Sequence, residues 1–224
     1  MIDLPPTVPL FTTPSGVEVV GFPAAGDDAL RWWERLRAEY PASGLWPLLM
    51  EEDTPEYLAD SYTYATVDES LAQAYALDGS KLLVPDFVDE GEWPSEPERP
   101  GFGLPYFRSG QPAQVTVALV PAAEPWLVPV VLHYGGWNKY PSPGEHAAIM
   151  RYWQERYGAE LVVLTGTTVE YAVARPPLTR PDALALAGRY RAYNDGEYDL
   201  YGAEHLTDLA AGLLGAQVWR MWWD

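Results

Sequence analysis

Apolar and polar residues alternate regularly in the C-terminal half of the chain. In TTVEYAVA (167–174), Val, Tyr and Val alternate with Thr, Glu and Ala, which predicts a strand with one face in the core. Apolar runs bounded by turn residues predict further strands. These runs are QVTVALV (114–120), WLVPVVLHY (126–134), ELVVLTG (160–166) and QVWRMWW (217–223).

Capping residues mark the starts of the predicted helices. Ser142 and Glu145 frame a capping box with proline at the favoured first position, which predicts a helix over 143–158 that ends at a glycine. Apolar residues recur along this segment at helical spacing. Two further helices are predicted over 179–193 and 203–214.

The order of these elements predicts the fold class. Residues 126–224 follow the order β-α-β-β-α-α-β, which is typical of a ferredoxin-like (split β-α-β) arrangement with one extra helix. Before it come a proline-broken extended arm (1–16) and a β-α-β unit made of VEVVGF (17–22), a helix over 28–40 and SGLWPLLM (43–50). We therefore expect an α+β protein.

Residues 51–99 are an acidic, loop-rich insertion. They contain fourteen carboxylates against two basic residues, and so carry −12 of the total net charge of −18. A T-x-x-E capping box predicts a helix over 67–77, and KLLVPDF (81–87) predicts a short strand. The stretch DEGEWPSEPERPGFG (89–103) predicts a loop, because proline, glycine and repelling carboxylates oppose a packed element.

Length and composition limit the class of protein. With 224 residues, 48% of them apolar, the chain is long enough for one large domain or two small ones. We predict an N-terminal region over 1–103 and a second domain over 104–224, packed as one globular unit. The absence of cysteine excludes disulfides and thiolate ligands. No signal peptide or long apolar run is present, so we expect a cytoplasmic protein without a membrane span.

The net charge also limits the kinds of partner that the protein can bind. A net charge of −18 disfavours nucleic acids and anionic membranes, because like charges repel. The acidic segment 51–99 is either a solvated surface or a docking face for a basic protein. Aromatic residues among its carboxylates favour docking; they are Tyr57, Tyr62, Tyr64 and Trp93.

Residues 114–224 contain, in this order, the segments GGWNKYPSPGEH, RYWQERYGAELVVLTG, VEYAVARPPLTRPDALALA and QVWRMWWD. Together these segments resemble a bacterial family catalogued as domain of unknown function 4253. Members of that family commonly carry a Phe-Cys-Pro-Asp-like stretch after the second helix, whereas this chain has AYNDGEYD (192–199). The resemblance implies the extent of the fold-bearing region and implies no particular activity.

The loop HYGGWNKYPSPGEH (133–146) joins a predicted strand to a predicted helix, a junction where α/β proteins often bind ligands. Glycines permit positive φ, while Asn138 offers a donor and an acceptor and Trp137 a stacking face. The alternative is a connector in which Trp137 is buried. The candidate ligand- or partner-binding residues of this loop are His133, Gly135, Gly136, Trp137, Asn138 and His146.

The three histidines, His133, His146 and His205, lack the spacing of a helical two-histidine metal site, so we predict no metal and no cofactor. His146 lies on the apolar face of its predicted helix, which favours a packed, hydrogen-bonded side chain. The alternative is an acid–base couple with Glu170 or Asp224. The chain has no G-x-S-x-G motif for a serine nucleophile.

The last predicted strand carries aromatic residues on both faces. Trp219, Met221 and Trp223 point one way and Trp222 points the other. We expect at least one face to be buried. An exposed Trp222 beside Trp137 would form an aromatic patch suited to protein binding.

Three functions are compatible with these patterns. The leading hypothesis is a non-enzymatic acidic protein-binding module, of the immunity or antitoxin type, that neutralises a basic partner; Trp93 and Trp222 are candidate contacts. The second is a small-molecule ligand-binding domain or enzyme that uses the loop 133–146. The third is a structural or accessory domain. Catalytic residues are not predicted, and a binding module is favoured over an enzyme.

Overall fold

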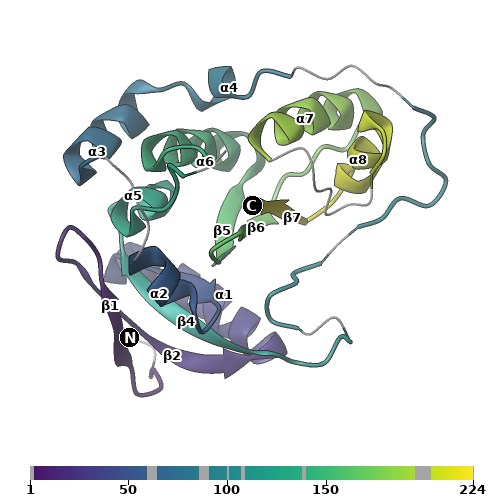
Figure 1. Ribbon diagram of the computed structural model, residues 1–224. Helices are drawn as coiled ribbons and strands as arrows, with labels where there is room; N and C mark the ends of the chain where they lie inside the picture. The colour runs from purple at the N-terminus through teal and green to yellow at the C-terminus, as the bar shows by residue number, and fades with distance from the viewer. Residues whose placement is uncertain are drawn as a thin grey trace.

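The computed structural model is an α+β protein built on one mixed sheet, as predicted (Figure 1). It describes residues 3–59, 65–85, 91–99, 101–106, 109–137, 140–194 and 203–223. The sheet has the strand order β1-β2-β4-β3-β5-β6-β7, in which only β3 and β5 are parallel neighbours. The strands are β1 (Val8–Thr12), β2 (Glu18–Ala25), β3 (Leu45–Met50), β4 (Gln114–Pro121), β5 (Ala159–Leu164), β6 (Thr168–Val173) and β7 (Val218–Trp222).

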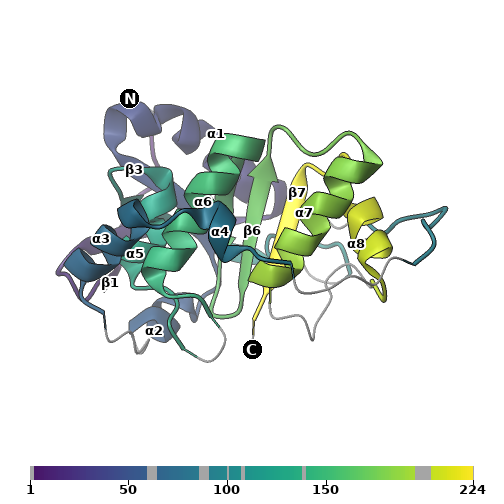
Figure 2. The same ribbon diagram turned by 90° about the horizontal axis from the view of Figure 1, so that it is seen from above.

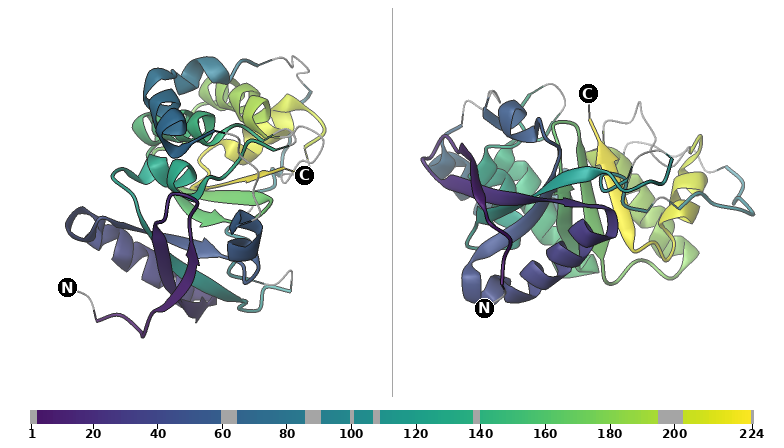
Figure 3. Two further views of the ribbon diagram at one scale, coloured as in Figure 1. Left: turned by 60° about the vertical axis from the view of Figure 1, so that its left-hand side comes forward. Right: turned by 90° about the horizontal axis from the view of Figure 1, so that it is seen from below.

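Helices cover both faces of this sheet (Figures 1 and 3). The helix α1 packs on one face, against β2, β3 and β4, while α5 to α8 lie on the other face. Outside α6, the helices α3 and α4 form an additional layer (Figure 2). The bounds are α1 (Gly26–Ser43), α2 (Thr54–Ala59), α3 (Val67–Ala76), α4 (Gly79–Leu82), the 3-10 turn η1 (Pro125–Leu127), α5 (Val128–Leu132), α6 (Pro143–Tyr157), α7 (Arg180–Tyr193) and α8 (Leu206–Leu213).

Side chains of β6 and β7 alternate between the helix layer and the opposite face. Val169 and Tyr171 of β6 and Trp219 of β7 are buried toward α6. The ring of Trp153, on α6, lies edge-on to Tyr171 at 5.8 Å and to Trp219 at 5.6 Å. The prediction that one face of TTVEYAVA enters the core is confirmed.

Strands β3 and β5 pair at a single register position, Leu49 with Val163. Near this narrow junction the carbonyl of Leu161 accepts hydrogen bonds from two indole N–H groups, those of Trp33 (3.3 Å) and Trp46 (3.0 Å). Buried carbonyls need such partners, and tryptophan supplies a donor together with a large apolar surface. The two tryptophans therefore tie α1 and β3 to the centre of the sheet.

The strand predicted over 126–134 is wrong, because this segment forms η1 and α5. Pro125 and Pro129 stand in the first turns of these helices, where a missing N–H costs no helical hydrogen bond. The helix is buried between β4 and α6. A continuous apolar run has no period that separates a buried helix from a buried strand, so the sequence pattern was ambiguous.

The ferredoxin-like arrangement of the C-terminal half is not confirmed. The strands joined by α7 and α8, β6 and β7, are adjacent and antiparallel rather than split by another strand. A split β-α-β unit lies instead in the N-terminal part, where β2 and β3 are joined by α1 and β4 is inserted between them. Strands from 1–103 and from 104–224 thus share one sheet.

The remaining elements agree in part with those predicted from the sequence. The arm over 1–16 contains the edge strand β1, and the helix predicted over 67–77 is α3, with its capping box intact. The strand predicted over 81–87 is wrong at Lys81 and Leu82, which end α4. The described part of the predicted loop 89–103 holds no helix or strand. Within the described ranges, no helix has the length and apolar character needed to cross a membrane.

Candidate functional site

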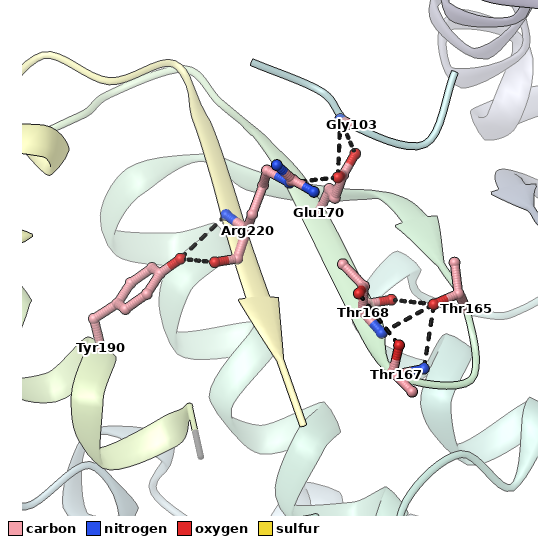
Figure 4. A network of polar contacts seen from close by, with 7 residues as sticks. All are labelled: Gly103, Thr165, Thr167, Thr168, Glu170, Tyr190 and Arg220. Carbon is pink, nitrogen blue, oxygen red and sulfur yellow. Dashed lines mark hydrogen bonds and ion pairs between the residues drawn. The ribbon is translucent and has the colours of Figure 1, made fainter. Parts of the chain in front are cut away.

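A polar cleft lies on the face of β5, β6 and β7 that is turned away from α6. The helix α1 covers the β2–β3 side of this face. Over β6 passes a segment that we call the strap, residues 101–106 (Figure 4). The cleft between strap and sheet has a volume of about 340 Å³. Its polar lining side chains are Glu51, Tyr106, Gln114, Thr165, Thr168, Glu170 and Arg220.

Glu170 is the central charged residue of the cleft. Its register partner across β6 and β7 is Arg220, whose Nε donates to Oε1 of Glu170 at 2.7 Å. The backbone N–H of Gly103, in the strap, donates to both carboxylate oxygens at 3.0 and 3.1 Å (Figure 4). Glu170 is 1% exposed, and this burial raises its pKa although the charge of Arg220 and the N–H of Gly103 oppose the shift.

A side chain at position 103 would require the Glu170–Arg220 pair or the strap to move. A Cβ added there would lie 2.4 Å from Nη2 of Arg220 and 3.0 Å from Oε1 of Glu170. The strap is also held at its end, where the hydroxyl of Tyr106 donates to the carboxylate of Asp27 at the start of α1. The ion pair thus lies directly beneath the strap backbone.

A threonine turn forms the floor of the cleft at the β5–β6 connection. The hydroxyl of Thr165 accepts hydrogen bonds from the backbone N–H groups of Thr167 (3.2 Å) and Thr168 (2.9 Å). This is the local turn bonding that threonine favours. The arrangement places the hydroxyls of Thr165 and Thr168 in the cleft lining.

Glu51 lies where the chain leaves β3. Its backbone N–H donates to Oγ1 of Thr54 at 3.1 Å, and its carbonyl accepts from the N–H of Thr54 at 3.3 Å. Its carboxylate has no hydrogen bond and no ion pair within the described ranges. The residue is exposed, but partial desolvation of its carboxylate, and then the negative charge of Asp53, raise the pKa of Glu51.

The loop 133–146 does not line this cleft. His133 is buried and ends α5 with a φ of 54°, and Gly135 and Gly136 have φ of 106° and 86°. A Cβ at Gly135 would lie 2.2 Å from the carbonyl oxygen of Pro141, so the glycine is needed for a close backbone approach. Asn138 lies outside the described residues.

Trp137 is partly buried rather than enclosed. Its ring lies edge-on to Tyr57 and Tyr134, both at 5.5 Å, and tilted against Tyr140 at 4.5 Å. These aromatic contacts join the loop to α2 and to the core. Such contacts are expected of a loop whose role is to connect two helices.

His146 is completely buried in the helix layer. Its Nδ1 is 2.5 Å from the hydroxyl oxygen of Tyr193, and burial lowers its pKa to about 3. The structure does not bring it to Glu170, which points to the opposite face of β6. Asp224, the other proposed acid–base partner, lies outside the described residues.

Two further candidate residues lie elsewhere on the surface. The half-exposed Trp93 has the guanidinium carbon of Arg180 4.6 Å from its ring centroid. Trp222, also half-exposed, donates its backbone N–H to Oδ1 of Asn194 at 2.6 Å. Neither of them lines the cleft.

The sequence analysis did not propose Glu51 or Arg220 as site residues, and it considered Glu170 only as a partner of His146. The signal that could have identified the site is the pairing of Glu170 with Arg220 across two neighbouring strands.

The family comparison covers the segment that carries the ion pair and the threonine turn of this cleft. Residues 116–224 match the model of a family described as "Domain of unknown function (DUF4253)". The resemblance predicted for 114–224 is confirmed. Glu170, Arg220 and the threonine turn lie in the DUF4253 segment, whereas Glu51 and the strap lie outside it. No curated protein and no solved structure matches the chain.

Proposed function

We propose that this protein binds a small polar molecule in the cleft beneath the strap. The observation that carries the proposal is the ion pair between the buried Glu170 and the partly exposed Arg220, which lines the cleft instead of being enclosed in the core. Removing the charge of Glu170 from water is costly, and replacing such an ion pair by apolar residues of similar volume is often at least as stable. Ligand sites are places where such polar groups are retained.

The other lining groups support the same function. The volume of about 340 Å³ falls in the range of small-ligand pockets, and threonine hydroxyls, a glutamine amide and a second carboxylate converge on it. These groups come from β4, β6, the β5–β6 turn and the residue that follows β3, so a rigid sheet would hold them ready for a ligand.

The test is a backbone amide NMR screen of the whole protein against a panel of polar metabolites. We expect shifts confined to Gly103, Thr165 and Thr168 and to their neighbours. Thr168→Val should weaken the binding about fivefold through the lost hydroxyl. The same substitution at Thr116, on β4 and outside the lining, is the control. A panel in which no member moves the cleft resonances would contradict the proposal.

A second proposal is that the acidic segment binds a basic protein, as an immunity- or antitoxin-like neutraliser would. One observation favours it: all of the described carboxylates of 51–99 are exposed, and within the described ranges only Asp78 forms an ion pair, with Lys81 at 3.5 Å. Exposed rings accompany them, since Tyr57 is 39% and Tyr75 is 55% exposed. The predicted contacts Tyr62 and Tyr64 lie outside the described residues.

This second proposal is tested by affinity capture from the native host at low and moderate salt. We expect a basic partner that is lost as salt rises, because screening weakens exposed charge pairs. Charge reversal at Glu52, Asp53 and Glu56 should abolish the capture, whereas reversal of Glu34 and Glu39 on α1 should not. Capture that depends neither on salt nor on the first three residues would contradict the proposal.

A further inference from the structure

We infer that the ligand of the cleft is a small hydroxylated amine, bound with its ammonium group against Glu51. This inference rests on the proposed function, ligand binding in the cleft beneath the strap. It goes beyond that function by naming the chemical class of the ligand and the residue that selects it.

The charges that line the cleft do not balance. Arg220 is already engaged by Glu170, and its Nη2 lies against the backbone of Gly103. Glu51 has no such cation among the described residues, so the described lining carries one unpaired negative charge. An ammonium group on the ligand would supply the missing partner and form a charge-assisted hydrogen bond.

The surroundings strengthen this preference. Asp53 is close enough to Glu51 to affect its ionisation, and Asp27 holds the hydroxyl of Tyr106 at the other side of the cleft. An anionic ligand would meet these carboxylates while the single lining cation is occupied. Like charges placed close together discriminate against a ligand of the wrong charge.

Glu51 is held in place for such a role. The two backbone hydrogen bonds between Glu51 and Thr54 form a tight turn, and Thr54 is completely buried. The carboxylate therefore projects from a fixed backbone position. A charged group fixed in advance loses little conformational freedom when its partner binds.

The neutral polar side chains of the lining indicate what the ligand carries besides its ammonium group. Thr165, Thr168 and Gln114 offer neutral donors and acceptors, which match hydroxyl groups. A hydroxylated ligand can form further hydrogen bonds with these groups, which an apolar ligand cannot. Among the described residues, no three His, Asp or Glu side chains are grouped as ligands for a metal ion.

The experiment compares three six-carbon polyols that differ in one terminal group: glucamine with an ammonium, sorbitol with a hydroxyl and gluconate with a carboxylate. Each is titrated at pH 7 into the full chain and followed by amide NMR at Gly103 and Thr168. We expect glucamine to bind about tenfold more tightly than sorbitol, and gluconate to bind most weakly.

Matched variants identify the selecting residue. Glu51→Gln should reduce the preference for glucamine over sorbitol to within about twofold, since the amide keeps the shape and loses the charge. Glu52→Gln, its exposed neighbour outside the lining, should leave the preference unchanged. Both variants alter exposed residues, and a thermal unfolding experiment would check that each variant folds.

The outcomes separate the inference from the proposed function. If sorbitol or gluconate shifts the cleft resonances as strongly as glucamine, the amine class is wrong while the cleft remains a ligand site. The same conclusion follows if Glu51→Gln keeps the preference, or if calcium chloride alone gives the Glu51-dependent shifts. If neither these polyols nor the metabolite panel reaches the cleft, the proposed function itself fails.

Discussion

The hydroxyl of Tyr190, on α7, occupies the place of a neighbouring strand beside Arg220. It accepts a hydrogen bond from the backbone N–H of Arg220 at 3.1 Å and donates one to the backbone carbonyl of the same residue (Figure 4). Two residues further along β7, Oδ1 of Asn194 accepts from the N–H of Trp222. Side chains of α7 thus cap the outer edge of β7, a position where strands otherwise pair with other chains.

Tyr190→Phe should therefore destabilise the protein. The substitution keeps the ring and leaves two backbone groups of Arg220 without a partner, so we expect a loss of about 1–3 kcal/mol in the free energy of unfolding, measured in urea. Tyr134→Phe is the matched control, because the buried Tyr134 hydroxyl has no hydrogen-bond partner among the described residues. Its removal should cost nothing or stabilise the protein slightly; equal losses in the two variants would contradict the edge-capping role.

Gly103→Ala should disrupt the strap. The added Cβ would meet Nη2 of Arg220 at 2.4 Å, so either the Glu170–Arg220 pair or the strap must move. We expect a loss of about 1–3 kcal/mol in the free energy of unfolding and weaker ligand binding in the cleft. Gly101→Ala, in the same strap but with no atom within 4 Å of its added Cβ, should behave as wild type.

Acid should destabilise the protein through His146. Its folded-state pKa of about 3 lies below the ordinary value of 6.5, so the unfolded chain binds a proton that the folded chain does not. This contribution to stability is fully present above about pH 6.5 and is lost as the pH falls toward 3, by about 1.4 kcal/mol per pH unit. Urea unfolding at a series of pH values should show a weaker pH dependence in His146→Asn than in the wild type; an unchanged dependence would contradict this role of His146.

Trp137→Ala should destabilise the protein by about 3 kcal/mol, at the low end for a tryptophan because the ring is only partly buried. The loss would come from the contacts with Tyr57, Tyr134 and Tyr140. A Trp137→Ala protein that melts within a few degrees of wild type would show that the loop is held mainly by its backbone.

Ser142→Ala should lower the free energy of unfolding by about 1 kcal/mol, because the cap at the start of α6 is lost.

Much of the candidate site could not be predicted from the sequence. The alternation of 167–174 placed Tyr171 in the core and Glu170 on the other face, as the structure has it. That Glu170 pairs with Arg220, fifty residues later, depends on the register between β6 and β7. The strap and Glu51 reach the same place through strand order, for which the sequence contains no local signal.

Features that depend only on neighbouring residues could be predicted from the sequence. The capping boxes at Ser142 and Thr66 satisfy backbone groups within one turn, so their motifs predicted α6 and α3 correctly. Strand alternation is equally local. The tertiary structure alone decided that 126–134 is helical, that β4 lies between β2 and β3, and that a cleft forms beneath the strap. These outcomes depend on which apolar surfaces bury one another across long sequence separations, a free-energy balance that no short pattern contains.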